Sequence, residues 1–304
     1  MSDRRPVVVY GASGFSARLI IEFLREYNVP FVAAGRDRAK IEDVLAHEQW
    51  GARFAEAGLL LAPATAYMSA VAEGCARIAM ERAPGIDSLE ILSMFNGFPT
   101  YGSTQTIFGQ LQWESFYLEQ NEYKLWPPVT TLEVTIPSSI TTQLALPWGG
   151  FPHPVWFKDH PQIANVRAFG GLLDRSIMEN IVGGQRAYQE NIKDLPPDEQ
   201  RRVLAEIADS VQPGSPPREN RRMQRTVDVV VGRGNLESIR VYAHGQGAYL
   251  MTGLIQAFAA HHLVHEPPRK LGFASPGEAF GHREILAALE AYGFVRITVD
   301  EPQR

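Results

Sequence analysis

Hydrophobic residues near the start of the chain follow the order strand, helix, strand. Residues 7–10 (VVVY) form a continuous apolar run, which is typical of a strand buried on both faces of a parallel sheet. Apolar residues then recur at helical spacing over residues 19–24, and a second apolar run occupies residues 31–34. The Asn-Val-Pro sequence at residues 28–30 separates the two. This order predicts one βαβ unit.

The next segment departs from the pattern of a doubly wound sheet. Residues 39–45 and 49–57 both favour helix, and a third strand is predicted only at residues 59–62. A full dinucleotide-binding domain would place further βα units before that point. We therefore expect that a segment near His47 is missing from the chain as written, with a naturally trimmed domain as the alternative.

The middle of the chain predicts a mixed or antiparallel sheet. A helix is predicted over residues 67–82, where small residues at helical spacing indicate close packing. The strand-like segments that follow are residues 89–94, 132–136, 142–146, 166–170, 227–231 and 239–244. A charged helical region at residues 175–209 interrupts them.

Two helices are predicted near the end of the chain, over residues 254–263 and 276–292. Ser275 stands just before the second, and Glu278 follows it by three residues. This spacing predicts a capping box, in which each side chain accepts a hydrogen bond from the other residue's backbone.

Composition and charge narrow the class of protein. The 304 residues allow two domains, and 45% hydrophobic with 21% charged residues is ordinary globular composition. The net charge of −5, without a concentrated basic region, argues against nucleic-acid binding. Cys75 is the single cysteine, no apolar signal segment precedes the first strand, and no apolar run reaches the length of a membrane span. We expect a cytoplasmic protein that binds neither nucleic acid nor membrane.

A glycine turn joins the first predicted strand to the first predicted helix. Residues 11–17 have G-x-x-G-x-x-A spacing, a variant of the dinucleotide-binding fingerprint. Gly11 permits a tight exit from the strand, and Gly14 lets backbone N–H groups approach a diphosphate at the positive end of the helix. A turn that serves only helix packing is the alternative. The predicted cofactor-binding residues of this segment are Gly11, Ala12, Ser13, Gly14, Phe15 and Ser16.

Arginines follow the second predicted strand, where NAD-binding domains usually carry an acidic residue. Arg36 and Arg38 are placed to bind the 2′-phosphate of the ribose by charge-assisted hydrogen bonds. Asp37 is more simply explained as a helix cap. The predicted cofactor is therefore NADP rather than NAD.

These signals predict an α/β fold with a Rossmann-type parallel sheet that lacks part of its middle, and an inserted α+β domain with a mixed sheet. Residues 1–82 plus 254–304 are assigned to the NADP-binding domain, and residues 83–253 to a domain for substrate binding and dimerisation.

Two tyrosines are candidate proton donors for hydride-transfer chemistry. Tyr67 follows the third predicted strand at a carboxyl end of the sheet, where ligands of open α/β folds bind. Tyr101 lies in an aromatic loop rich in turn residues. Packing at the domain junction is the alternative for Tyr67.

Other polar residues are candidates for substrate binding. Asn96 lies in the same aromatic loop, and Tyr249 precedes a helix after a glycine pair. His153 and Lys158 stand in a segment rich in aromatic residues that alternatively forms a dimer contact. No metal-binding signature is present, and Cys75 is explained as a core residue.

The two ends of the chain resemble the saccharopine dehydrogenase-like reductases, a group that includes the trans-acting enoyl reductases. The resemblance rests on residues 7–38, on Thr252-Gly253 leading into a helix, and on residues 274–293. It implies an NADP-binding Rossmann domain completed by the C-terminal helices, an inserted α+β domain that shapes the substrate site, and often a homodimer. The middle of the chain departs from that pattern, so the substrate does not carry over.

We therefore predict an NADP(H)-dependent oxidoreductase that reduces a C=C or C=N bond of a small organic substrate. A saccharopine-type amino-acid dehydrogenase is the alternative enzyme, and it would need a basic pocket for two carboxylates. A redox sensor that binds NADP without turnover is the alternative outside enzymes.

Overall fold

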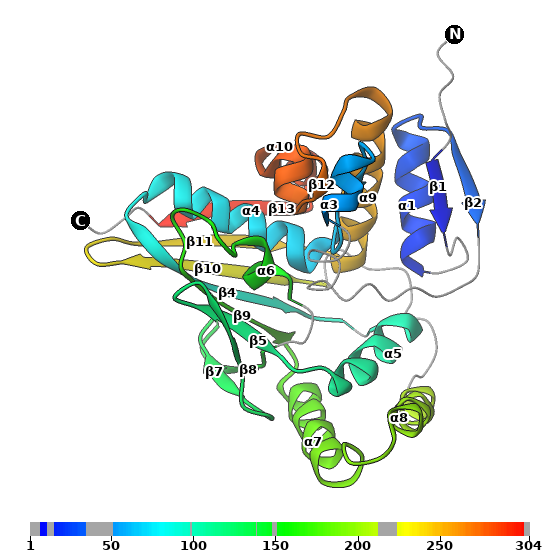
Figure 1. Cartoon of the computed structure of the whole chain (residues 1–304), viewed down its shortest axis with the longest axis vertical. Coiled ribbons are helices and arrows are strands. Elements are labelled where there is room, and N and C mark those ends of the chain that lie inside the picture. Colours follow the sequence, from blue (N-terminus) through cyan, green and yellow to red (C-terminus); the bar gives the residue numbers. More distant parts are fainter. Residues whose placement is uncertain are drawn as a thin grey trace.

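The computed structural model describes residues 7–10, 15–34, 51–97, 99–137, 139–147, 151–211 and 224–300. A large mixed sheet forms its middle layer, with helices on both sides (Figure 1). No helix among these residues is both long and apolar enough to cross a membrane.

The predicted βαβ unit is present. Strand β1 (Val7–Tyr10) pairs in parallel with β2 (Phe31–Ala34), and α1 (Phe15–Glu26) connects them. Helix α1 packs along α9 (Ala248–His265). The two helices approach so closely at Gly253 that a Cβ there would lie 2.8 Å from the Cβ of Leu19. Glycine is therefore required at this crossing.

Seven strands form the large sheet in the order β13-β11-β10-β4-β9-β5-β6. Strands β4 and β9 are parallel, and the other neighbours are antiparallel. The strands are β4 (Ile86–Phe95), β5 (Phe116–Glu119), β6 (Glu122–Leu125), β9 (Asn165–Leu172), β10 (Thr226–Gly234), β11 (Ser238–Gly245) and β13 (Val295–Asp300). The predicted α/β class, with parallel elements and a mixed sheet, is confirmed.

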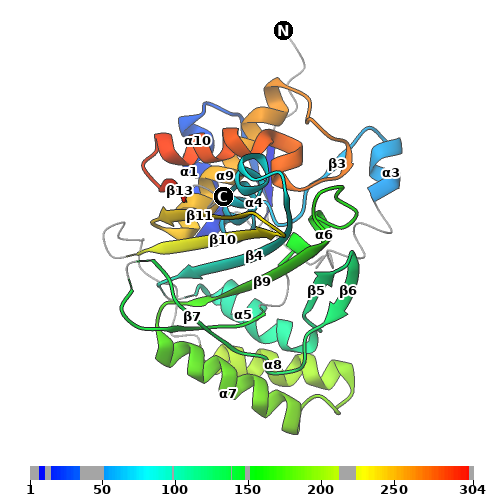
Figure 2. The ribbon, with the colours of Figure 1, turned by 90° about the vertical axis from the view of Figure 1, so that its left-hand side faces the viewer.

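Each face of the large sheet has its own cover (Figure 2). Helix α4 (Tyr67–Arg82) packs on one face over β10 and β11, together with α9 and α10 (His282–Ala291). The hairpin β7 (Leu132–Val134) and β8 (Gln143–Ala145) lies on the other face with α7 (Arg175–Asn191) and α8 (Pro197–Val211). Successive side chains of β10 therefore point to opposite faces of the sheet. Val230 belongs to the core under α4, and Val229 belongs to the core under the hairpin.

A second short parallel pair joins β3 (Leu60–Leu61) to β12 (Gly272–Phe273), beside α3 (Gly51–Glu56). Within the described residues no ladder connects this pair to β1 and β2. The remaining elements are α5 (Tyr101–Gly109), the 3₁₀ turn η2 (Gln110–Gln112), α6 (His153–Trp156) and the π-helical turn η3 (Gly277–Gly281).

Most local predictions from the sequence are confirmed. All six strand-like segments of the middle region contain strands, and α4 has its predicted bounds. The capping box forms, with Ser275 N–H donating to Glu278 Oε2 at 3.0 Å and Glu278 N–H donating to Ser275 Oγ at 3.1 Å. His47 lies outside the described residues, so a missing segment there stays a prediction. The domain boundaries also stay a prediction, and β13 pairs with β11 in the large sheet.

Candidate functional site

Four helices begin close together in the molecule, and Tyr249 links three of them. Its ring meets that of Phe15, the first residue of α1, edge to face with centroids 5.3 Å apart. Its hydroxyl accepts a hydrogen bond from Thr100 N–H at 2.9 Å and lies 2.7 Å from Ser103 Oγ. Thr100 caps α5, and Tyr249 itself belongs to the first turn of α9.

The fourth helix, α4, begins beside the same turn of α9. Tyr67 N–H donates to Thr252 Oγ1 at 3.2 Å, and Gln256 Nε2 donates to the carbonyl of Thr65. We call the region where α1, α4, α5 and α9 begin the helix junction; Figure 1 shows it below β1. Helix N-termini carry partial positive charge and free N–H groups, so their convergence favours an anionic ligand.

The glycine sequence at residues 11–14 stands in the chain between β1 and α1, whose first residue contacts Tyr249 at this junction. Gly11, Ala12, Ser13, Gly14, Arg36 and Arg38 lie outside the described residues, and their roles stay predictions. Phe15 and Ser16 form the start of α1 and are half-buried. The parallel pairing of β1 with β2 places the turn at the carboxyl end of β1, as the dinucleotide-binding arrangement requires.

A cluster of buried polar side chains lies beneath the start of α4. Ser93 on β4 and Asp228 on β10 are register partners, and the Ser93 hydroxyl donates to Asp228 Oδ1. Both residues are fully buried, and Thr226 and Tyr67 are nearly so. The Tyr67 hydroxyl lies close enough to the Asp228 carboxylate for the negative charge to raise the pKa of the tyrosine, although no hydrogen bond of standard geometry joins them.

Burial controls the ionisation of this group. It raises the pKa of Asp228 to about 7, against the smaller opposing effect of the Ser93 hydrogen bond. Burial, with the nearby Asp228 carboxylate, raises the pKa of Tyr67 well above its ordinary value. Tyr67 thus holds its proton at neutral pH. Sequence reasoning missed Ser93 and Asp228, although a carboxylate within the apolar run Val227–Val231 was a usable signal.

The two tyrosines proposed as proton donors lie in different surroundings. Tyr67 is only 1% exposed, whereas Tyr101 is 53% exposed and donates through its hydroxyl to Asp209 of α8 at 2.9 Å. Neither lines the cavity at the ends of β10, β11 and β13 described below.

The residues predicted to bind substrate also do not lie together in one site. Asn96 extends the ladder between β4 and β10, because its N–H donates to the Arg225 carbonyl at 2.9 Å and its Oδ1 accepts from Arg225 N–H. His153 is fully buried, with Nε2 3.1 Å from the Ser69 carbonyl, and burial lowers its pKa to about 4. Lys158 pairs with Asp159 at 2.9 Å. Tyr249 alone among these residues lies at the helix junction.

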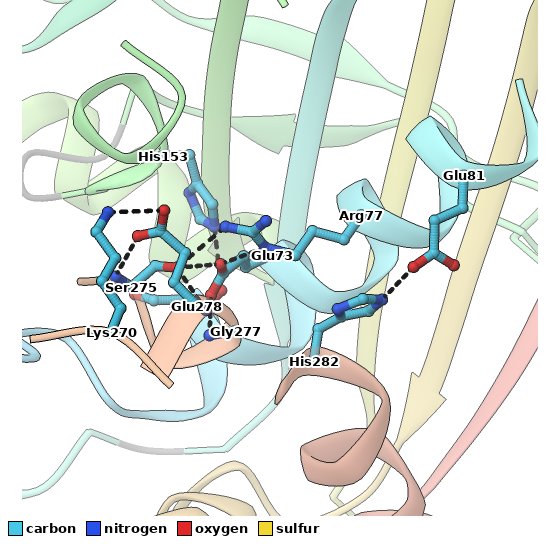
Figure 3. Close-up of polar contacts among 10 residues, drawn as sticks. Glu73, Arg77, Glu81, His153, Lys270, Ser275, Gly277, Glu278 and His282 are labelled. Atoms are coloured by element: carbon cyan, nitrogen blue, oxygen red, sulfur yellow. Dashed lines mark hydrogen bonds and ion pairs between the residues drawn. The ribbon is translucent and has the colours of Figure 1, made fainter. Parts of the chain in front are cut away.

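A second polar cluster fixes α4 against η3 and α10 (Figure 3). The buried Glu73 carboxylate accepts from Arg77 Nε at 2.7 Å, from Gly277 N–H at 2.8 Å and from the Ser275 hydroxyl. Glu278 of the capping box pairs with Lys270 at 2.9 Å. Because each described charge in this cluster has a partner of opposite sign, we interpret it as structural.

A cavity of about 700 Å³ lies at the ends of β10, β11 and β13, next to the segment that joins β7 to β8. His244 and Arg296 are register partners on its floor, and Arg225 precedes β10 at its edge. No carboxylate is among the described residues that line it. Arg225 and Arg296 are about 70 residues apart in the sequence, so local patterns could not predict that they line the same cavity.

A family profile described as "Family of unknown function (DUF5938)" matches residues 70–301. The structure of apo histidine-tagged saccharopine dehydrogenase (L-Glu forming) from Saccharomyces cerevisiae is similar with a TM-score of 0.46 and 10% sequence identity, over 96% of this chain and 84% of that chain. No curated protein matches the sequence.

Proposed function

The chain belongs to the DUF5938 family of unknown function, and we propose that it is an NADP(H)-dependent oxidoreductase that reduces a C=C or C=N bond of a small organic substrate. One observation carries this proposal. A parallel β1-α1-β2 unit has a G-x-x-G sequence between β1 and α1, and α1 begins at the helix junction.

The residues at the junction fit an anionic dinucleotide. The N–H groups of the first turn of α1 would bind the diphosphate, with Gly11 and Gly14 leaving room for its approach. The hydroxyls of Tyr249 and Ser103 stand at the same place. Arg36 and Arg38 would bind the 2′-phosphate. The cofactor, once bound, supplies the hydride.

The proton for the second half of the reduction would come from Tyr67 or Tyr101. The raised pKa of Tyr67 keeps its hydroxyl protonated at neutral pH, and Asp228 behind it would return a proton to the tyrosine after transfer. The Tyr67 side chain is buried away from solvent, so a role as donor requires the first turn of α4 to separate from Thr252. Tyr101 needs no such movement because its side chain is exposed.

A second candidate function is supported by the cationic cavity. A saccharopine-type amino-acid dehydrogenase needs basic groups for substrate carboxylates, and Arg225, His244 and Arg296 line one cavity at the ends of β10, β11 and β13. An NADP-binding redox sensor, the candidate outside enzymes, would use the same cofactor site without turnover.

Calorimetric titration of the purified protein with NADPH and NADH tests the cofactor. We expect NADPH to bind, and Arg36→Ala with Arg38→Ala to remove its advantage over NADH. Gly14→Val should weaken binding by roughly tenfold or more because its side chain would block the diphosphate. Gly183→Val on α7 is the matched control, since nothing lies within 4 Å of a Cβ there.

Turnover separates the candidate functions. NADPH oxidation would be measured with enones, enoyl thioesters and imines, and with 2-oxo acids plus amino acids. Reaction with the first panel supports the proposed reductase, and reaction only with the second supports the dehydrogenase. Binding without turnover supports the sensor, and absence of NADPH binding to the intact protein would overturn all three.

A further inference from the structure

The cavity at the ends of β10, β11 and β13 has basic side chains on one face of the large sheet. His244 and Arg296 are register partners, and His244 is also the register partner of Val227 on β10. Val227 belongs to the core under the hairpin of β7 and β8, which lies on this face (Figure 2). Residues opposite each other in a ladder share a face, so His244 and Arg296 point to the hairpin side as well.

Arg225 reaches the same place from the start of β10. Its N–H donates to Asn96 Oδ1 and its carbonyl accepts from Asn96 N–H at 2.9 Å, so the ladder with β4 continues to this residue. Arg225 stands two residues before Val227, and side chains two residues apart in a strand share a face. Cβ atoms of directly opposite residues are about 5 Å apart, and those of diagonal neighbours about 7–8 Å. The three basic side chains are therefore near neighbours.

The two arginines have no acidic partner among the described residues. Arg225 and Arg296 are exposed, and neither forms an ion pair with a described side chain. The described residues that line the cavity include no Asp or Glu. Arg233, which is also exposed on β10, instead pairs with Glu90 on β4. An anion in the cavity would supply the partner that Arg225 and Arg296 lack.

The closeness of the charges indicates which anion fits. The two arginines are always charged, and a phosphate monoester carries about 1.5 to 2 negative charges at pH 7 on three adjacent oxygens. A monocarboxylate would leave one arginine without a counter-charge, and a dicarboxylate holds its charges at two separate points. Guanidinium groups bind phosphate oxygens through paired hydrogen bonds. A compact phosphate group therefore suits this arrangement best.

The rest of the cavity has room for an organic group. Its volume of about 700 Å³ is within the range of small-molecule sites. Apolar residues of the lining include Ile136, Leu173 and Val227. A ligand with a phosphate on a small, largely apolar body would use both parts of the lining.

We propose that this cavity binds a phosphorylated small molecule, with Arg225, His244 and Arg296 around its phosphate group. The inference goes beyond the proposed function and does not depend on it, because it rests on the residues of this cavity alone. Binding of substrate carboxylates, which the second candidate function requires here, is the competing use, and the experiment compares the two.

Phenyl phosphate is the probe, and calorimetry at low ionic strength measures its binding. We expect saturable binding with a Kd of about 1 mM or tighter. Phenol, which lacks the phosphate, benzoate, which has one charge, and glutarate, a dicarboxylate, should each bind at least about fivefold more weakly. Added sodium chloride should weaken the binding of phenyl phosphate because it screens the charges.

Arg225→Gln and Arg296→Gln each remove one charge and should weaken phenyl phosphate binding roughly tenfold. Arg240→Gln is the matched control, because Arg240 is exposed on β11, four residues before His244, but does not line the cavity. It should change the Kd by less than about twofold. Circular dichroism and thermal melting confirm that each variant is folded.

The variant Gly14→Val separates this site from the cofactor site. It should weaken the binding of NADPH but not of phenyl phosphate, and Arg296→Gln should do the reverse. A protein that binds phenyl phosphate but not NADPH would overturn the proposed function and support this inference.

Several results would overturn the inference. These are no binding of phenyl phosphate to the folded protein, equal or tighter binding of phenol, benzoate or glutarate, or an effect of Arg240→Gln as large as that of Arg296→Gln. Tighter binding of glutarate would favour the amino-acid dehydrogenase. Equal weakening of NADPH and phenyl phosphate by Gly14→Val would also overturn the inference, since it would place both ligands at one site.

Discussion

Ser93 and Asp228 face each other across the ladder between β4 and β10, and the serine hydroxyl donates to the aspartate in a position closed to solvent. A carboxyl group in such a place prefers its neutral form, because no cation among the described residues lies beside it to compensate the charge. This pair connects the stability of the large sheet to pH.

Asp228→Asn should change how stability depends on pH. The pKa of Asp228 is raised to about 7 in the folded protein, above its ordinary value of 3.8 in an unfolded chain. The folded state therefore holds an extra proton between these values, and the wild type loses stability as pH rises through this window. The variant should be more stable than the wild type by a few kcal/mol near pH 8, with the difference fading near pH 4.

Urea unfolding at a series of pH values measures this effect. Asp198→Asn is the control, because that carboxylate is on the surface of α8 and should leave the pH profile unchanged. Parallel profiles for wild type and Asp228→Asn would contradict the prediction.

Gly253→Ala should separate α1 from α9. The added Cβ would lie 2.8 Å from the Leu19 Cβ and 3.1 Å from its carbonyl carbon, so backbone must move. We expect a loss of about 1–3 kcal/mol in the free energy of unfolding, measured by denaturant titration. Gly184→Ala, in open space on α7, should instead be neutral or stabilising by up to about 1 kcal/mol. Equal effects at the two glycines would show that the crossing is not tight.

Tyr249→Phe tests the hydrogen bonds at the helix junction. The variant keeps the ring contact with Phe15 but leaves the Thr100 N–H without its acceptor and removes the hydrogen bond between the Tyr249 and Ser103 hydroxyls. A loss of about 1 kcal/mol is expected, with faster amide hydrogen exchange at Thr100. Tyr101→Phe, which removes an exposed hydrogen bond to Asp209, should cost less than about 0.5 kcal/mol. If the two variants were equally stable, the hydroxyl of Tyr249 would have no special role.

Glu73→Ala should be among the most destabilising changes in the chain. It leaves Arg77, the Ser275 hydroxyl and Gly277 N–H without their shared acceptor in a buried place (Figure 3). Loss of one partner of a buried ion pair costs about 3–5 kcal/mol.

The matched control for this prediction is Glu81→Ala, on the same helix, which removes a surface pair with Arg283 and His282. It should cost about 1 kcal/mol or less by thermal melting. A small effect of Glu73→Ala would mean that water replaces the carboxylate.

The sequence by itself determined the features that depend on near neighbours. The β1-α1-β2 unit, the bounds of α4 and the capping box of Ser275 and Glu278 follow from apolar spacing, turn residues and helix caps, because these act within a few residues.

Only the tertiary structure decided which distant residues meet. Ser93 and Asp228 are 135 residues apart, and Thr100 and Tyr249 are 149 apart, so strand register and helix packing bring them together. A one-residue shift in the register of β10 would turn Asp228 away from α4, and no local pattern specifies that register. The helix junction and the cationic cavity arise from the same long-range packing.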